Sequence, residues 1–102
     1  MITQIQEQII SGRYRLTQHA HIEMADENII LDEVFDAILK GKILEDYPEH
    51  KRGPCCLLCG KTKAGKFLHV VCTTALSVLV LITVYEPKLP KWKTPFKRGG
   101  EK

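Results

Sequence analysis

Residues 67–86, which read FLHVVCTTALSVLVLITVYE, are the most apolar stretch of the chain and decide its fold. The 19 residues 67–85 carry almost no charge, and a transmembrane helix of that length shows the same pattern. Nine of those 19 residues, however, are Val, Ile or Thr, and the polar residues Thr73, Thr74 and Ser77 interrupt the stretch. β-Branched residues on both sides of a polar link predict two buried strands and no membrane span.

The residues before this stretch add two further strands to a predicted sheet. Its four strands are Ile43–Tyr47, Cys56–Lys61, Phe67 to about Thr73, and Val78–Glu86. Short links between consecutive strands favour an antiparallel meander. The last strand, VLVLITVY, is apolar on both faces, which predicts an interior strand with helices covering one side of the sheet.

Three helices are predicted ahead of the sheet, at Ile2–Ile10, Thr17–Asn28 and Leu31–Lys40. Thr17 is a suitable N-cap and Asn28 a suitable C-cap for the second helix. The intervening residues 13–16 form either an extended segment or an edge strand. The predicted fold is therefore α+β, with two or three N-terminal helices packed on a four-stranded antiparallel sheet.

Length and composition fit one compact domain. The chain has 102 residues, of which 44% are hydrophobic and 26% charged, and its ordinary Gly and Pro content excludes collagen-like and fully disordered classes. We expect a single domain over residues 1–87 and a basic, flexible tail over residues 88–102. The N-terminus has no basic region followed by an apolar core, so a cytoplasmic location is expected.

Charge is distributed unevenly along the sequence. Residues 1–60 hold 6 Lys and Arg against 10 Asp and Glu, whereas residues 61–102 hold 9 against 2. A basic C-terminal part attracts polyanions such as RNA, and an acidic surface elsewhere suits a basic partner. A basic tail that serves only solubility remains an equal alternative.

Four cysteines raise the question of a structural metal. Cys56 and Cys59 have the C-x-x-C spacing, with His69 and Cys72 as further possible zinc ligands. A strand would, however, turn Cys56 away from Cys55 and Cys59, and the two leucines between the thiols do not suit a zinc knuckle. Buried core thiols are the preferred interpretation, so no metal or cofactor is predicted, and a zinc-stabilised interaction domain is the third alternative.

Two histidines are candidate acid and base groups. His19 falls in the first turn of the second helix, where backbone N–H groups and the helix dipole attract anions. His69 lies on an otherwise apolar strand and is expected to be partly buried. The competing interpretation is structural for both, and His21 and His50 look like surface residues.

RNA cleavage needs a base for the 2′-hydroxyl, an acid for the leaving oxygen and cations for the phosphate. His19 and His69 are the predicted acid and base, and Tyr85 is a third candidate catalytic residue at the end of the last strand. Aromatic residues able to stack a base are Tyr47, Tyr85 and Trp92. The candidate phosphate-binding cations are Arg13, Arg15, Lys61, Lys66, Lys91 and Lys93.

Several short motifs follow one another in order between about Tyr14 and Trp92. They are Thr17-Gln-His19-Ala20, Met24, Val34, Leu39-Lys-Gly41, Tyr47-Pro48, Cys56-Leu-Leu-Cys59-Gly60, Leu68-His69-Val70-Val71, Ile82-Thr83-Val84-Tyr85-Glu86-Pro87 and Trp92. Their order and spacing resemble the bacterial domain-of-unknown-function family 4258. The residues that match its recurring positions are Thr17, His19, Met24, His69, Tyr85 and Pro87. Two departures are Ile30, where the family tends to have a Ser or Thr cap, and the link 74–77, which lacks an acidic, glycine-containing turn.

The family is similar to toxins of the RelE, ParE and BrnT type. This resemblance implies a RelE-like fold, an RNA target and a protein antitoxin as partner. The leading hypothesis is a toxin-like, metal-independent endoribonuclease that uses His19 and His69. The alternative is a non-catalytic module of the same fold that binds a protein or a nucleic acid.

Overall fold

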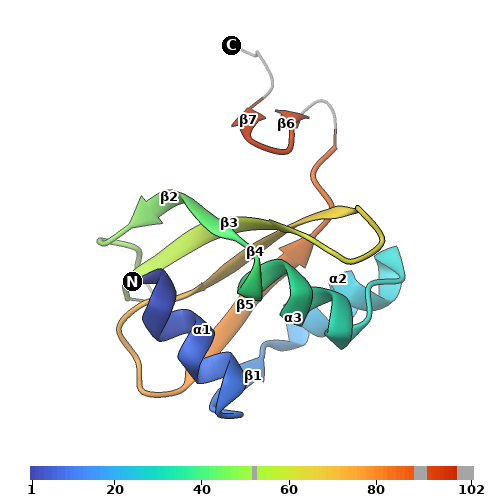
Figure 1. Cartoon of the computed structure of the whole chain (residues 1–102). Coiled ribbons are helices and arrows are strands. Elements are labelled where there is room, and N and C mark those ends of the chain that lie inside the picture. The colour runs from blue at the N-terminus through green and yellow to red at the C-terminus, as the bar shows by residue number, and fades with distance from the viewer. Residues whose placement is uncertain (52, 89–91, 99–102) are drawn as a thin grey trace.

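The computed structural model describes residues 1–51, 53–88 and 92–98, which form three helices and two sheets (Figure 1). The helices are α1 (Ile2–Ile10), α2 (Gln18–Glu27) and α3 (Leu31–Leu39). The strands are β1 (Tyr14–Leu16), β2 (Lys42–Tyr47), β3 (Cys55–Lys61), β4 (Phe67–Thr73), β5 (Leu79–Tyr85), β6 (Trp92–Thr94) and β7 (Lys97–Arg98). All three predicted helices and all four predicted strands are confirmed to within one or two residues at each end.

The main sheet of the described chain has five strands, so the predicted number of four is wrong. Its order is β1-β5-β4-β3-β2, and β2 to β5 form the predicted antiparallel meander. The additional strand is β1, which pairs in parallel with β5, with Tyr14 opposite Leu79 and Leu16 opposite Leu81. Three residues are too few to display strand periodicity, and a parallel partner is distant in sequence, so the pattern alone did not decide this pairing.

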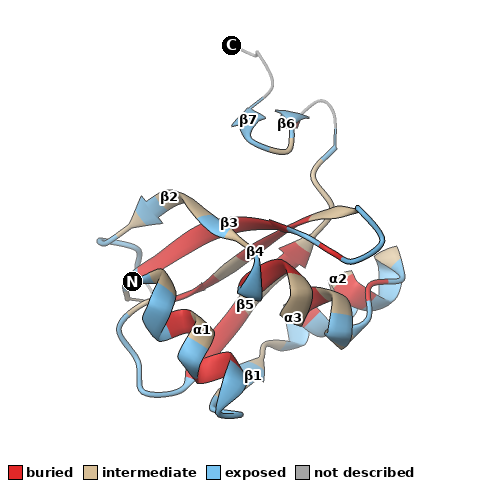
Figure 2. Ribbon diagram, viewed as in Figure 1, coloured by how far each residue is buried: buried red, intermediate tan, exposed pale blue. Residues whose placement is uncertain are grey.

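The helices cover one face of the sheet, as predicted, and the main core lies between the two layers (Figure 2). Ile5 and Ile9 of α1 and Val34 and Ile38 of α3 are buried there. Helix α3 approaches β3 so closely that a Cβ atom on Gly60 would lie 1.7 Å from the carbonyl oxygen of Ala37. Glycine at this position is what allows the helix backbone to rest on the strand.

Local caps fix the ends of the helices. The Thr17 side chain accepts a hydrogen bond from the Ala20 N–H, and Asn28 ends α2 in the left-handed conformation with φ 56°, so both predicted caps are confirmed. Ile30 offers no side-chain acceptor at the start of α3. Instead, the Glu33 side chain accepts the Ile30 N–H at 3.1 Å, which is one half of a capping box.

Helix α2 completes the edge of β5 beyond the short strand β1. The Thr17 hydroxyl donates to the Ile82 carbonyl at 2.9 Å. Carboxylates of Glu23 and Glu27 accept the N–H groups of Val84 and Glu86, each at 2.9 Å. Glu23 and Glu27, one turn apart on α2, thus accept hydrogen bonds from backbone N–H groups at the edge of β5. In a longer sheet a neighbouring strand would bind these groups.

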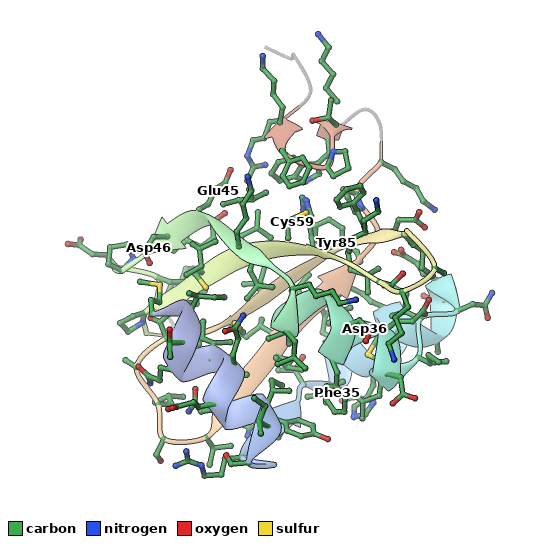
Figure 3. The ribbon with its side chains drawn as sticks, in the orientation of Figure 1. Phe35, Asp36, Glu45, Asp46, Cys59 and Tyr85 are labelled. Atoms are coloured by element: carbon green, nitrogen blue, oxygen red, sulfur yellow. The ribbon has the colours of Figure 1, made fainter. Side chains whose placement is uncertain are left out.

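The face of the sheet opposite the helices is called here the open face, and residues 92–98 pack on part of it. These residues form the β6–β7 hairpin, whose Trp92 is 3% exposed. Arg98 binds both carboxylate oxygens of Glu45 on β2, at 2.7 and 2.9 Å. Glu45 and Tyr85 lie on the hairpin side of the sheet in Figure 3. The flexibility of residues 88–102 stays a prediction, but residues 92–98 make specific contacts with the domain.

Among the described residues, no helix combines the length and the apolar character needed to cross a bilayer.

Candidate functional site

A groove crosses the open face along β5, and three adjoining cavities form it. The first, of about 530 Å³, lies between α2 and Trp92; the second, of about 360 Å³, has Leu57 and Val71 in its floor. The third, of about 510 Å³, is lined by both His19 and His50. Thr83 lines all three cavities, so they form one continuous site, which we call the groove.

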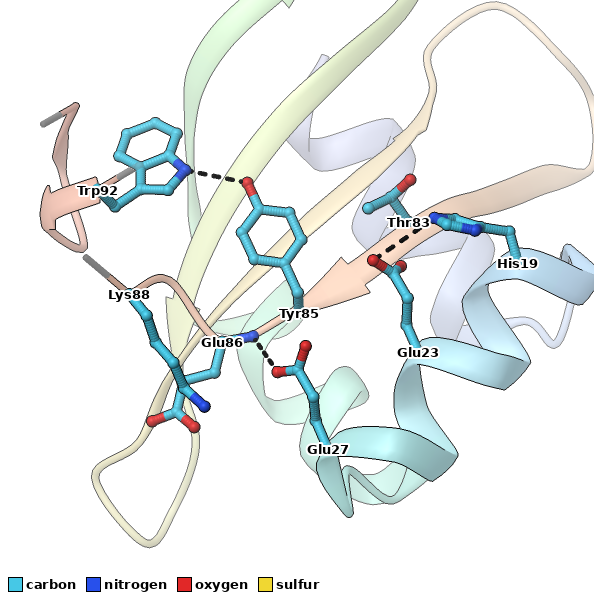
Figure 4. Close-up of a pocket in the computed structure, with 8 residues that line it drawn as sticks. All are labelled: His19, Glu23, Glu27, Thr83, Tyr85, Glu86, Lys88 and Trp92. Atoms are coloured by element: carbon cyan, nitrogen blue, oxygen red, sulfur yellow. Dashed lines mark hydrogen bonds and ion pairs between the residues drawn. The ribbon is translucent and has the colours of Figure 1, made fainter. Parts of the chain in front are cut away.

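His19 is presented to the groove by the first turn of α2. Its side chain is 65% exposed, and its Nε2 lies 3.5 Å from Oε2 of Glu23, one helical turn later (Figure 4). The other oxygen of Glu23 accepts the Val84 N–H of β5, so this carboxylate is itself held in place. A carboxylate held by the backbone in this way can orient the His19 imidazole through its Nε2.

His50 is the second histidine of the groove and comes from the loop between β2 and β3. The turn is closed by hydrogen bonds from His50 N–H to the Tyr47 carbonyl and from Gly53 N–H to the His50 carbonyl. Gly53 has a φ of 99°, which a glycine adopts without strain. The turn brings His50 and Lys51 to the same cavity as His19.

His69 does not line any cavity of the groove. Its side chain is fully buried, and Nε2 lies 2.6 Å from the Pro95 carbonyl oxygen, which can only accept a hydrogen bond. In the neutral ring Nδ1 then accepts from the Tyr85 hydroxyl at 3.1 Å, and the Trp92 indole N–H donates to that hydroxyl at 3.2 Å. His69 is therefore the centre of a hydrogen-bonded chain that holds the hairpin, and it shares none of the three cavities of the groove with His19.

Two tyrosines form walls of the groove. Tyr85 lines its first and second cavities, and Tyr47 lines the second. Burial, followed by the hydrogen bond to Glu45, raises the pKa of Tyr47 to about 12. Burial also raises the pKa of Tyr85 above its usual 10. Both phenols are therefore neutral near pH 7, and each offers a ring for stacking and a hydroxyl for hydrogen bonding.

The two ends of the groove carry opposite charge. Carboxylates gather at the α2 end, where Glu23, Glu27 and Glu86 line the first cavity with Lys88. At the other end the charged groups are Lys51 and Arg98, and the Arg98 guanidinium is paired with Glu45. A phosphate is favoured at the Lys51 end and a cationic group at the α2 end.

The predicted phosphate-binding cations are dispersed over the molecule. Arg13 and Arg15 are exposed beside or on β1, the edge strand farthest from β2. Lys66 pairs with Glu33 of α3 at 3.3 Å. Lys61 extends over the ring of Phe67, with Nζ 5.5 Å from its centroid. Lys93 is exposed on β6, and Lys91 lies outside the described residues.

All four cysteines are buried and reduced, and they are divided between the two faces of the sheet. Cys56 and Cys72 pack in the core under the helices, directly opposite each other on β3 and β4. Burial raises the pKa of Cys59 on the open face to about 11, so its thiol is protonated near neutral pH. Among the described residues, no three His, Cys, Asp or Glu side chains are grouped as a metal site requires.

His50 and Thr83 are residues of the groove that the sequence pattern does not predict. Nothing in the spacing of His50 connects it with His19, so the pattern predicts an ordinary surface residue. The available signal was local: a histidine followed by Lys51 and Arg52 in a loop that also contains Gly53. Thr83 is the polar residue in the interior of the apolar strand β5, which is a pattern typical of a residue that faces a cavity.

A protein-family model described as "Domain of unknown function (DUF4258)" matches residues 16–86, from β1 to just beyond β5. The chain belongs to this family. The match includes α2, α3 and the four antiparallel strands, together with His19, His50 and Thr83. No curated protein and no solved structure matches the chain.

Proposed function

We propose that this protein is an RNA-directed, toxin-like endoribonuclease whose acid–base pair is His19 and His50. The observation that carries the proposal is that both imidazoles line one cavity, together with Lys51 and Thr83. His69 is not part of the proposed pair because its ring nitrogens bind Pro95 and Tyr85 beneath the hairpin. The proposed target is still RNA, and His50 takes the place of His69 as the second histidine of the pair.

The chemistry is a transesterification followed by release of the 5′ product. One imidazole removes the proton of the 2′-hydroxyl, whose oxygen attacks the adjacent phosphorus. The bond to the 5′-oxygen breaks, the second imidazole protonates that oxygen, and a 2′,3′-cyclic phosphate remains. Lys51 lines the same cavity and is the proposed cation for the added negative charge of the transition state.

Aromatic walls support single-stranded RNA as the substrate class. Tyr47 and Tyr85 line the second cavity above an apolar floor that includes Leu57 and Val71. A splayed nucleobase has an apolar face and polar edges, and such an environment accepts it by stacking. The paired bases of a duplex do not offer these faces.

A protein antitoxin is the proposed partner, and the acidic end of the groove supports a basic segment as its contact. Glu23, Glu27 and Glu86 line the same cavity as His19. A basic side chain bound there would cover His19 and block cleavage. We further propose a relationship to the RelE, ParE and BrnT type of fold, supported by helices that precede the antiparallel strands β2 to β5.

The experiment is a cleavage assay with purified protein, a fluorogenic single-stranded RNA and excess EDTA. We expect His19→Ala and His50→Ala each to slow cleavage by about 10²- to 10⁴-fold, which is the usual contribution of one acid or base. His21→Ala, an exposed histidine of α2, is the matched control and should cleave at the wild-type rate. Wild-type rates in both groove variants, or a product without a cyclic phosphate, would contradict the mechanism.

A non-catalytic RNA-binding module is the second candidate. It is favoured by the paired rings and lysines at the far side of the hairpin, which are suited to binding and carry no acid–base pair. This candidate predicts a salt-sensitive complex with RNA and no turnover. The same assay distinguishes it, because the RNA would then remain intact with the wild-type protein.

A further inference from the structure

We infer that single-stranded RNA contacts a second site outside the groove, at a surface made of Lys42, Lys61, Phe67 and Phe96. We call these four residues the Lys–Phe surface. The inference rests on the proposed function, since it names where the nucleotides flanking the groove bind. It concerns binding alone and includes no chemical step.

Two aromatic rings and two ammonium groups build this surface. The rings of Phe67 on β4 and Phe96 in the hairpin meet edge to face, with centroids 5.2 Å apart. The Nζ of Lys42 lies 4.7 Å from the centroid of Phe96, and the Nζ of Lys61 lies 5.5 Å from the centroid of Phe67. Alternating aromatic rings and cations are the arrangement with which proteins stack bases and neutralise phosphates of single strands.

The charges of the surface are available to a ligand. Neither Lys42 nor Lys61 forms an ion pair with any carboxylate in the described part of the chain. By contrast, Lys66 and Arg98 are paired with Glu33 and Glu45. An ammonium group that is not neutralised by the protein retains its attraction for a phosphate.

Phe96 has ring surface left for stacking. Although it contacts Phe67 and Lys42, it is still 46% exposed at the turn of the hairpin. An exposed phenylalanine held by its neighbours loses little conformational freedom when a base stacks on it. The exposed ring of Phe96 can therefore stack on a nucleobase at a small cost in conformational entropy.

The register of the sheet aligns the surface with the groove. Val71, in the floor of the groove, and Phe67 are four residues apart on β4, on the same face of the strand, which is roughly 13 Å. Between them lies His69, covered by the hairpin. Arg98 lines the groove and is only two residues from Phe96, so one strand of RNA can pass over the hairpin and contact both sites.

The test measures the affinity of the full chain for a fluorescein-labelled 2′-O-methyl oligouridine of about 12 nucleotides, which lacks the attacking hydroxyl. Phe96→Ala should weaken binding about 5- to 150-fold, the effect of losing one stacked base, and Phe96→Tyr should restore it. Lys42→Gln and Lys61→Gln should each reduce the slope of log K against log salt by about 0.7. Arg13→Gln removes the same charge at the opposite edge of the sheet and should leave the slope unchanged.

The outcomes separate this inference from the proposed function. Wild-type affinity in Phe96→Ala, or an equal change of slope in Arg13→Gln and Lys42→Gln, overturns the Lys–Phe surface whether or not RNA is cleaved in the groove. If the binding changes occur as expected but the wild-type protein cleaves no RNA, the inference stands and the nuclease proposal fails. Trp92 emission in each variant checks that the hairpin remains in place.

Discussion

His69 illustrates how tertiary contacts decide the role of a single residue. A histidine on an apolar strand is commonly either a catalytic group with a shifted pKa or a core residue whose ring nitrogens are both hydrogen-bonded. Here the Pro95 carbonyl and the Tyr85 hydroxyl bind its two ring nitrogens, and Trp92 packs against its ring with centroids 4.3 Å apart. We therefore assign it a structural role, the attachment of the hairpin to the sheet.

Replacing His69 by alanine should lower the free energy of unfolding by about 1–3 kcal/mol, because buried hydrogen-bonding groups lose their partners. Trp92 is the single tryptophan of the chain, and its emission should shift to longer wavelength as the hairpin loosens. Chemical denaturation followed by tryptophan fluorescence measures both effects. His21→Ala, on the exposed side of α2, should stay within about 0.5 kcal/mol of wild type. Equal stability of the two variants would argue against the attachment role.

At the scale of elements, the packing of α3 on β3 determines the distance between the two layers. Ala37 of the helix is completely buried and lies directly over Gly60. The sequence signal for this contact is weak, since Cys-Gly-Lys at the end of a strand does not identify which helix approaches it. The close approach of Ala37 to Gly60 is a property of the tertiary packing of α3 on β3.

Gly60→Ala should destabilise the protein by at least about 3 kcal/mol, because the new methyl group would collide with backbone atoms that cannot rotate away. Gly65→Ala is the comparison variant. Its new methyl group would have no neighbour closer than 3.8 Å, and only its φ of 88° opposes alanine, at a cost of about 1–2 kcal/mol. Thermal unfolding of the two variants provides the comparison, and the reverse order of stability would contradict this packing.

The ion pair between Arg98 and Glu45 links the hairpin to β2. The hydrogen bond from Arg98 holds the pKa of the Glu45 carboxyl below its usual 4.5. Because the folded-state pKa is lowered, the stabilisation is complete above pH 4.5 and is lost as the pH falls through the lower pKa of the folded state. The size is less than about 1 kcal/mol, since Arg98 is half-exposed.

Acid should therefore loosen the hairpin, and Glu45→Gln should remove part of this pH dependence. We expect the Trp92 emission of the wild type to change more between about pH 6 and pH 3 than that of the variant. Superimposable titrations would show that the ion pair does not contribute to holding the hairpin.

At the scale of the whole molecule, the fold places acidic and basic side chains on different surfaces. Acidic side chains of α2 lie at one end of the groove, and the lysines of the Lys–Phe surface lie beyond the hairpin. A chain with a small net charge of +3 thus presents surfaces of both signs. We propose the first as the contact for a basic protein segment and the second as the contact for RNA.

Deleting residues 89–102 should uncover the open face without unfolding the domain. The core beneath the helices contains no residue of the hairpin, whereas Phe67, His69 and Tyr85 all contact it. We expect unchanged far-UV circular dichroism together with a clear increase in binding of the dye ANS. Loss of secondary structure in the truncated chain would show that the hairpin is required for folding.

The sequence by itself determined the helices, the caps Thr17 and Asn28 and the four antiparallel strands, because these depend on residues close together in the chain. It also indicated a family to which the chain belongs. His19, which it predicted as a site residue, lines the groove, and its catalytic role stays a prediction. Only the tertiary structure decided that β1 joins β5 in parallel, that the hairpin buries His69 and that His50 lines the same cavity as His19. Each of these depends on segments 26 to 65 residues apart, and their approach is determined by packing, which no local pattern records.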